Sequence, residues 1–428
     1  MKANLPELES AYRRQLAESI ERLIELSSRI NEAKPRQYWY PLSMAAYGVE
    51  EIIEALDSMC RFRTTMWEKT LEFERRFSVY QGCSDSVMVN SGSSADLLLA
   101  FLLTDAAWPA LERGDEILVP VVTWPTQIWS AMMAGLNVRL VDVDPETLNL
   151  DLDDLERKIT ARSRAVFPVH LMGNPCDMDR VMALAKAHDL VVIEDCCEAL
   201  GAEWDGRKVG NFGLGASYSF FFSHHMTTME GGMIACQSGE IAERLRILRA
   251  HGWVRNVDAS RHDLGSYDVD PCYAFVNWGF NVRPTDLQAG FGLQQLLKLP
   301  EFNRRRAGLA QRFFSFIDSK SHLERPRVLG KARPSWFALP LRVSDDAPFT
   351  RSELVNYLES QGVETRPIVA GNLARHPAAR LFPAFGAGSF PGADNIHERG
   401  FYLGLSPLFT DSSLDRLTTC FESFLGRY

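Results

Sequence analysis

The chain has 428 residues, of which 46% are hydrophobic and 24% charged, and its 55 acidic against 46 basic side chains give a net charge of -9. This length suggests two or three domains with a sizeable core, and the acidic balance disfavours nucleic-acid binding, which needs a basic face. No apolar run approaches the roughly 20 residues of a membrane span, and the start, MKANLPELES, lacks the apolar stretch of a signal peptide. The eight cysteines contain no CxxC pair, so we expect a cytoplasmic protein with reduced thiols and no metal site.

The first segment, residues 1–34, is predicted to form one helix that ends at Lys34-Pro35, because proline discourages further helix. The positions expected to face inward recur at helical spacing, and Ser27 is the one polar residue among them. They are Leu16, Ile20, Leu23, Ser27 and Ile30. We expect residues 1–40 to be an N-terminal helical extension that packs on the body or on a second subunit.

Short β-rich runs then alternate with helical stretches up to about residue 236. Strands are predicted at 86–90, 115–120, 137–143, 165–169 and 190–194, with a helix at 95–103. Strands separated by helices predict an α/β fold, in which right-handed crossovers surround a large, mostly parallel sheet. We assign residues 41–300 to this large, cofactor-binding domain.

The last part of the chain is predicted to be a smaller α+β domain over residues 301–428. A strongly helical segment, 284–311, leads into it, and a strand at 335–342 and a helix at 350–361 follow.

The motif Asn90-Ser-Gly-Ser-Ser-Ala95 lies between a predicted strand and the helix after it. Its hydroxyls stand beside the free N–H groups of a helix N-terminus, which together suit an anion such as phosphate. An ordinary serine N-cap is the alternative reading.

Asp195 closes the apolar run Val191-Val-Ile-Glu194, which places it at the carboxyl edge of the sheet, where α/β folds bind ligands. A carboxylate there can pair with a protonated heterocyclic nitrogen, and Glu198, three residues further on, can face the same cleft. The alternative is a strand-end aspartate that caps the next helix.

Two adjacent histidines, His224 and His225, follow an aromatic run and precede a Gly-Gly turn. Neighbouring side chains on an extended segment point to opposite sides, so one of the two is expected to face a given site. Trp124, after the strand ending at Pro120, can stack on a flat ring. A structural histidine and a core tryptophan are the alternatives.

Taken in order, these motifs resemble the DegT/DnrJ/StrS family of sugar aminotransferases, which use pyridoxal 5'-phosphate (PLP). The resemblance covers about residues 40 to 428. It rests on the motifs NSGSSA, PVVTWPT, VDVDPETLNLD, HLMGNPCDMD, EDCCEALGA, SYSF, MEGGM, GFNVRPTDLQAG and LKLPEFNRRR. It implies the type I aminotransferase fold and a homodimer with shared active sites.

Carried over position by position, the resemblance implies that Asp195 pairs with the pyridinium nitrogen and that Trp124 stacks on the cofactor ring. The implied phosphate contacts are Ser93, Ser94 and Ser219, with Asn281 contributed by the partner subunit. Glu198 stands where the aminotransferases usually carry glutamine.

The informative departure lies at His224, because the aminotransferases of this family carry their cofactor lysine at that position. No lysine occurs between Lys208 and Lys298. An imidazole moves protons near neutral pH but cannot be a permanent covalent anchor. We therefore expect non-covalent PLP and pyridoxamine 5'-phosphate (PMP), with His224 as the base and Glu198 beside it in the catalytic group.

The 3-dehydratase branch of the family also carries histidine at this position, so the chain resembles that branch. Four further segments favour the same branch: SFFFSHHMTTMEGG, RAHGWVRN, SWFALPL and RPIVAGN. The branch removes a hydroxyl from a nucleotide-linked 4-keto-6-deoxy sugar, here most like GDP-4-keto-6-deoxymannose on the route to colitose, an O-antigen sugar. L-glutamate would renew PMP, and nitrogen would leave as ammonia. By position alone, the candidate substrate contacts are His251, Trp253, Arg255 and Arg366.

Two other functions stay open. One is a PLP-dependent dehydratase or aminotransferase acting on another keto carbohydrate, such as a sugar nucleoside in antibiotic biosynthesis. The other is a catalytically inactive homologue that serves as a scaffold or binding subunit. A sister enzyme uses an iron–sulfur cluster, which needs four cysteines. Since residues 250–270 contain none and Cys197 stands alone, we expect no cluster here.

Overall fold

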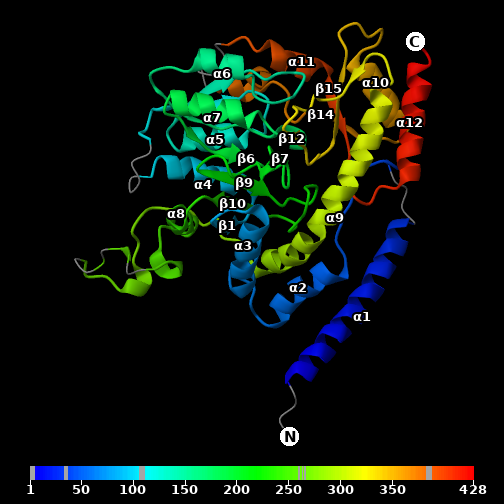
Figure 1. Cartoon of the computed structure of the whole chain (residues 1–428). Coiled ribbons are helices and arrows are strands. Elements are labelled where there is room, and N and C mark those ends of the chain that lie inside the picture. The colour runs from blue at the N-terminus through cyan, green and yellow to red at the C-terminus, as the bar shows by residue number, and fades with distance from the viewer. Residues whose placement is uncertain are drawn as a thin grey trace.

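A mostly parallel β-sheet forms the centre of the larger part of the molecule (Figure 1). The computed structural model describes residues 5–32, 37–105, 111–258, 261–262, 264, 267–381 and 388–428. The strands of the sheet are β1 (Asp85–Val89), β2 (Glu116–Pro120), β3 (Asn137–Val141), β4 (Ser163–Val166), β5 (Val191–Val192), β6 (Glu194–Asp195), β9 (Gly215–Ser219) and β10 (Gly232–Cys236).

The strand order is β3-β2-β4-β5 in one half of this sheet and β6-β9-β10-β1 in the other. The two halves meet at residues 191–195, where the backbone N–H groups of Ile193 and Asp195 donate to the carbonyls of Val166 and Pro168. Among the described strands of the sheet, only β10 runs antiparallel to its neighbours. The predicted mostly parallel sheet is therefore confirmed.

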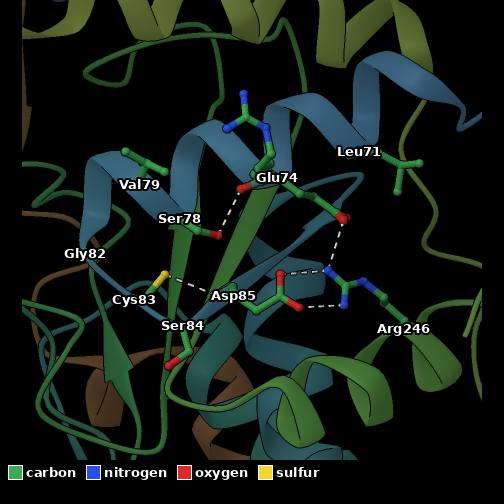
Figure 2. Close-up of a pocket in the computed structure, with 10 residues that line it drawn as sticks. Leu71, Glu74, Ser78, Val79, Gly82, Cys83, Ser84, Asp85 and Arg246 are labelled. Carbon is green, nitrogen blue, oxygen red and sulfur yellow. Dashed lines mark hydrogen bonds and ion pairs between the residues drawn. The ribbon is translucent and has the colours of Figure 1, made fainter. Parts of the chain in front are cut away.

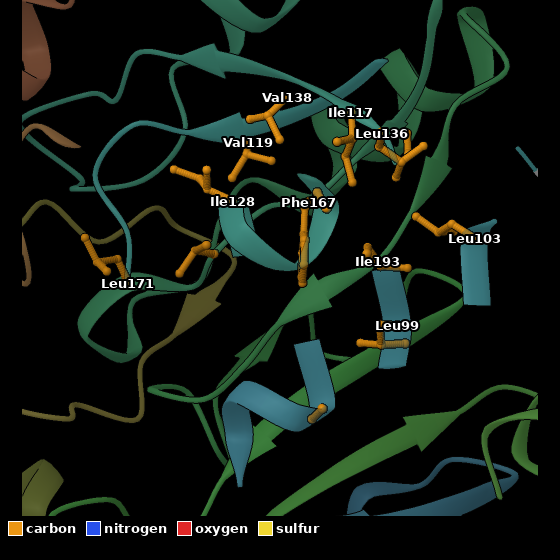
Figure 3. Packing of buried hydrophobic residues seen from close by; sticks show 14 of the residues in the cluster. Leu99, Leu103, Ile117, Val119, Ile128, Leu136, Val138, Phe167, Leu171 and Ile193 are labelled. Carbon is orange, nitrogen blue, oxygen red and sulfur yellow. The ribbon is translucent and has the colours of Figure 1, made fainter. Parts of the chain in front are cut away.

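Helices cover both sides of the sheet and bury its apolar side chains. They are α4 (Gly92–Leu103), α5 (Thr126–Met133), α6 (Leu152–Lys158), α7 (Met178–Ala187) and α8 (Gly239–Arg249). In the core shown in Figure 3, Leu99 of α4 and Ile128 of α5 pack around Phe167 and Ile193. Burial on both faces explains why the strands read as near-continuous apolar runs.

The N-terminal helices α2 (Val49–Cys60) and α3 (Glu68–Gln81) pack against the long helix α9 (Asp286–Ile317). The first half of α9 contributes apolar side chains to the core of the large sheet, and its second half contributes to a separate core. The expected domain boundary at residue 300 therefore falls inside one continuous helix, and it stays a prediction.

A four-stranded antiparallel sheet with the order β11-β13-β15-β14 forms the C-terminal part. Its strands are β11 (Leu323–Glu324), β13 (Leu339–Val343), β14 (Thr365–Pro367) and β15 (Gly400–Leu403), and its helices are α10 (Arg351–Ser360), α11 (Pro391–Arg399) and α12 (Asp411–Leu425). A small sheet joins β12 (Ala332–Arg333) to β7 (Glu203–Trp204) and β8 (Arg207–Lys208). Short 3-10 turns lie at Leu171–Gly173, Val254–Asn256, Pro271–Tyr273, Leu373–Arg375 and Pro377–Leu381.

The strand expected at 335–342 begins only at Leu339, which corrects that prediction. The backbone N–H groups of Ser335 and Phe337 donate to the carbonyls of Gly173 and Met172, both at 3.0 Å. These residues therefore bond to a loop at the sheet edge in place of a neighbouring strand.

The N-terminal helix α1 (Leu5–Glu32) contacts the rest of the chain through α2 and stands beside the body in Figure 1. Arg13 donates to Glu54 at 2.8 Å, and Ile20 is buried. The predicted inward stripe holds only in this middle portion, because Leu23 and Ile30 are 65% and 59% exposed. The remaining parts of the 1–34 prediction lie outside the described residues. None of the helices in the described ranges has the length and apolar character that crossing a membrane requires.

Candidate active site

Two buried carboxyl groups lie together at the carboxyl end of β6. Asp195 ends the strand and accepts a hydrogen bond from the backbone N–H of Cys197 at 2.8 Å. Asp96, on the second turn of α4, accepts one from the Thr126 hydroxyl at 2.8 Å, and its other oxygen is buried without a partner. One oxygen of each carboxyl lies within 4.8 Å of the other.

Burial raises the pKa of both carboxyl groups, and the neighbouring Asp195 charge raises the pKa of Asp96 further. Two anions this close in a dry site repel each other, so one keeps its proton or a cation settles between them. Among the described residues, no lysine or arginine forms an ion pair with either group. The site is therefore suited to a ligand that brings positive charge.

The first turn of α4 faces the end of β9. Ser91 caps the helix by accepting the N–H of Ser94 at 3.1 Å, and the Ser93 side chain is exposed. A Cβ atom at Gly92 would lie 2.5 Å from Cβ of Ser219, so only glycine allows this approach. The structure thus brings the predicted phosphate residues Ser93, Ser94 and Ser219 to one helix N-terminus, where an anion is favoured.

Trp124 follows β2 at the same edge of the sheet and is 60% exposed, so it does not belong to the core. Two residues later, Thr126 begins α5 and bonds to Asp96, which places the loop bearing the indole beside the carboxyl pair. Thr123, just before the indole, is held by its hydroxyl bond to Gln127 at 2.6 Å.

The two histidines lie in a turn after β9 and are held differently. His225 is buried and donates from Nε2 to the carbonyl of Ser335 at 2.9 Å, which is a structural role. The ring of His224 packs edge-on to Phe337 at 5.1 Å between centroids, and its Nδ1 is buried without a partner. Burial and then the charge of Arg306 lower the pKa of His224 to about 4, so its imidazole is neutral at physiological pH.

Glu198 lies between these groups and the loop at 172. Its carboxylate accepts the N–H of Met172 at 2.8 Å, and the Met172 carbonyl accepts from Phe337. Burial, together with the Asp195 charge, raises the pKa of Glu198 to about 7. Glu198 is therefore poised to gain or lose a proton near neutral pH.

Three side chains near these groups were not predicted. Asp96 is the one charged residue in the apolar run from Ala95 to Leu103, and that position was the signal for it. Burial raises the pKa of Tyr402 to about 12, the charge of Glu198 raises it further, and the charge of Arg366 lowers it. Arg306 ends the motif LKLPEFNRRR, which is one of the motifs behind the family resemblance, but the sequence alone indicates no function for this arginine.

The remaining predicted contacts lie apart from this cluster. Asn281 is exposed and accepts a hydrogen bond from Arg283 at 2.9 Å. Arg255 lies over the ring of Trp253 at 5.0 Å, and the Trp253 indole N–H donates to the Cys272 carbonyl. None of these interactions joins them to Asp195 or His224 within the described single chain.

Two other predicted substrate contacts have different surroundings. His251 is exposed and adopts a positive φ of 65° at the turn after α8. Arg366 lies on β14 opposite Tyr402 and pairs with Glu364 at 2.8 Å, so it faces the same region as Glu198.

A cavity of about 600 Å³ lies elsewhere, between α3 and α8 (Figure 2). Arg246, its prominent charged group, binds Asp85 with both terminal nitrogens and also reaches Glu74. Its charge is thus neutralised within the wall by Asp85 and Glu74, as Figure 2 shows.

A buried group of His170, Glu194 and Cys196 also offers metal-binding atoms. The carboxylate of Glu194 is fully engaged, since it accepts from the backbone of Gly210, Phe212 and Gly213 as well as lying 3.2 Å from the His170 ring. His170 Nδ1 accepts the N–H of Cys176. These bonds make the group a structural support beneath the sheet edge.

The fold and the group of side chains at the ends of β6 and β9 define a sugar aminotransferase-type chain. Residues 46–422 match the DegT/DnrJ/EryC1/StrS aminotransferase family, so the chain belongs to that family. A GDP-4-keto-6-deoxy-D-mannose 3-dehydratase of Yersinia pseudotuberculosis is 37% identical over 369 residues, which cover 85% of this chain and 93% of that protein.

Solved structures agree with this relationship. GDP-4-keto-6-deoxymannose 3-dehydratase, crystallised as a histidine-to-asparagine mutant with bound GDP-perosamine, gives a TM-score of 0.84 at 32% identity and covers 89% of this chain and 99% of its own. The same enzyme with a trapped PLP-glutamate geminal diamine gives 0.83 at 32% identity, with the same coverage. The predicted family and aminotransferase fold are confirmed.

Proposed function

We propose that this chain is a PLP-dependent sugar 3-dehydratase that acts on a nucleotide-linked 4-keto-6-deoxy sugar, most like GDP-4-keto-6-deoxymannose, with L-glutamate renewing PMP. The observation that carries the proposal is His224, a half-buried neutral imidazole at the position of the family's anchoring lysine. Support comes from relatives named as 3-dehydratases at 37% and 32% identity over most of the chain.

The donor set of the site fits PLP. The first turn of α4, with the hydroxyls of Ser93, Ser94 and Ser219, suits the phosphate. The two buried carboxyl groups lack a cation, as described above, and Asp195 would hold the protonated ring nitrogen. The exposed face of Trp124 would cover the ring.

When bound, this cofactor supplies a carbonyl or amine group and a protonated ring that withdraws electrons from the reacting carbon. Asp195 would keep the ring nitrogen protonated, because its charge favours the cation. His224 accepts a proton at its neutral imidazole, and Glu198, with its pKa raised to about 7, can return one near neutral pH.

The replacement of lysine by histidine determines which product leaves. An imidazole moves protons but does not form the covalent amine link by which lysine would release an amino sugar. Loss of the hydroxyl therefore ends in a deoxy keto sugar and ammonia, with glutamate converted to its keto acid.

We include a homodimer in the proposal. The exposed Asn281, whose side chain accepts a hydrogen bond from Arg283 of its own chain, would serve the phosphate site of the partner subunit. Sedimentation velocity at enzyme-assay concentration should give a dimer, whereas a monomer with full activity would contradict this arrangement.

The substrate class is tested by incubating the enzyme with glutamate and GDP-, CDP- and dTDP-linked 4-keto-6-deoxyhexoses. The expected products are a deoxy keto sugar lighter than the substrate by one oxygen atom and one equivalent each of ammonia and keto acid, detected by mass and coupled assay. An amino sugar among the products would make the chain a transaminase.

His224→Asn should lower the rate of dehydration roughly 100-fold or more, which is the range for loss of a general base. PLP affinity, measured by absorbance titration, should stay unchanged. His225→Asn is its matched control, because the His225 ring bonds to the Ser335 carbonyl. If His225→Asn is the inactive variant and His224→Asn is active, the wrong histidine has been assigned.

His224→Lys tests the position itself. A lysine Nζ there should form a borohydride-trappable bond to PLP, read as a mass increase of the intact chain, while dehydration is lost. A chain that never gains this mass would show that position 224 does not face the cofactor carbonyl.

A further inference from the structure

Arg306 is a buried arginine on α9, only 5% exposed, whose guanidinium is directed at three backbone carbonyls. Its Nη1 donates to His225 at 2.9 Å, its Nη2 to His224 at 3.1 Å, and its Nε to Leu405 at 3.1 Å. The planar guanidinium thus binds both carbonyls of the histidine turn at once and fixes their relative positions.

The charge of Arg306 has no acidic partner among the described residues. The other deeply buried arginine, Arg249, shows the usual solution, since it pairs with Glu74 at 2.7 Å. Burial lowers the pKa of Arg306 to about 10, which still leaves it cationic at neutral pH. An uncompensated buried charge is costly, so its retention calls for a function.

None of the described residues that line the small cavity at the turn carries a negative charge. The small cavity beneath His224 is lined by segments 43–46, 222–227 and 405–406 and by Gln295 and Arg306. Its only titratable lining groups are His224, His225 and Arg306. The segment at 335–337 contributes only a carbonyl and the Phe337 ring.

We propose that Arg306 is the positioning residue of the His224 base: its three bonds hold the turn in place, and its unpaired charge keeps the imidazole unprotonated and able to accept a proton. This inference rests on the proposed function of His224. The direction agrees with the lowered pKa of both histidines, to which burial and then Arg306 contribute. A nearby like charge disfavours the protonated form of an imidazole.

Two variants separate the bonds from the charge. Arg306→Lys keeps the charge but cannot span three carbonyls, so kcat should fall roughly 10- to 100-fold, the range for a small misplacement of a reacting group. The acidic limb of its pH profile should stay within a few tenths of a unit of wild type. Arg306→Gln keeps N–H donors without the charge, so its acidic limb should move upward by roughly one unit or more.

A second readout does not use activity. In cofactor-free protein labelled at histidine, the His224 signal, assigned by its absence in His224→Asn, should titrate at higher pH in Arg306→Gln than in wild type. Arg305→Gln is the control, because the neighbouring Arg305 reaches the Phe409 carbonyl and Asp411 at the surface. It should leave kcat, the pH profile and the titration unchanged.

An unchanged His224 titration in Arg306→Gln would overturn the electrostatic role, and wild-type kcat in Arg306→Lys would overturn the positioning role. If Arg306→Gln does not fold, judged by near-UV circular dichroism, Arg306→Lys still decides the positioning role. An active His224→Asn enzyme would instead refute the proposed function, while the shift of the His224 titration would stand.

Discussion

At the scale of single residues, the site depends on ionisable groups whose charge is set by burial. Asp96 and Asp195 share one dry space, and the pKa of Asp96 is raised well above its ordinary value by burial and by the Asp195 charge. His224 is neutral for the same first reason. Burial thus prepares an acid that keeps its proton and a base that lacks one.

This assignment makes the stability of the cofactor-free protein depend on pH through Asp96. Above its unfolded pKa of about 3.9, the folded chain binds more protons at this carboxyl than the unfolded chain, so stability falls as pH rises towards the raised pKa. Each unit by which the pKa of Asp96 in the folded chain exceeds its unfolded pKa changes the free energy of unfolding by about 1.4 kcal/mol.

Asp96→Asn should remove that dependence, because an amide imitates the protonated acid and still accepts from Thr126. Urea unfolding at several pH values should show that the free energy of unfolding of the variant rises relative to that of wild type as pH rises from 4 to 8. Asp96→Ala, which leaves the Thr126 hydroxyl without its partner, should be destabilised by about 1 to 3 kcal/mol. A constant difference between Asp96→Asn and wild type would mean that Asp96 is ionised in the fold.

The sequence was sufficient to predict some of these residues and not others. Asp195 was placed at the sheet edge because it ends an apolar strand, and the structure puts it there. Asp96 could not be predicted because its role depends on Asp195, 99 positions further along the chain, and no local pattern reveals that contact. Arg306 stayed hidden for a similar reason, since its partners are backbone carbonyls that have no sequence signature.

At the scale of elements, α4 and α8 form a natural comparison. Each begins with a glycine and is capped by a serine that accepts an N–H in the first turn, Ser91 for α4 and Ser238 for α8. A Cβ atom at Gly92 would collide with Ser219, whereas Gly239 has no atom within 4 Å of that position. Equivalent helix starts therefore differ only in what they face.

Gly92→Ala should weaken PLP binding by roughly tenfold or more, because Ser219 must move away from the phosphate site. A single lost positioning contact of about 1.4 kcal/mol corresponds to that factor. Gly239→Ala should bind PLP as wild type does. Equilibrium dialysis of both variants measures the difference, and equal affinity would place the phosphate elsewhere.

Element prediction succeeded where burial made strands uniformly apolar and failed where backbone bonds went to loops. The run at 190–194 was expected as one strand and occurs as β5 and β6, which serve different halves of the sheet. Residues 335–338 have a strand-like pattern but bond to the loop at 172–173. Both departures lie at the site edge, where tertiary contacts decide the backbone.

At the scale of the whole molecule, α1 is set apart from the catalytic machinery. It begins before the part of the chain that matches the family, and its described contacts are with α2, including the Arg13 bond to Glu54 and the pair of Glu9 with Arg61. None of the residues assigned to the site touches it in the described chain.

Deletion of residues 1–36 should therefore leave PLP affinity and kcat within about twofold of wild type. The lost ion pairs are partly exposed and contribute about 1 kcal/mol or less each, so a small fall in thermal stability is expected. A loss of activity much larger than the loss of stability would place α1 at an active site, and steady-state kinetics beside thermal melts decides between these outcomes.

The three carbonyls bound by Arg306 come from opposite halves of the molecule. His224 and His225 follow the large sheet, whereas Leu405 follows β15 of the C-terminal sheet. The Arg306 side chain therefore bonds to both parts of the molecule. Any rotation of the C-terminal part about α9 would strain at least one of these bonds. A displacement of the C-terminal sheet relative to the large sheet would therefore also move the backbone that carries the imidazole.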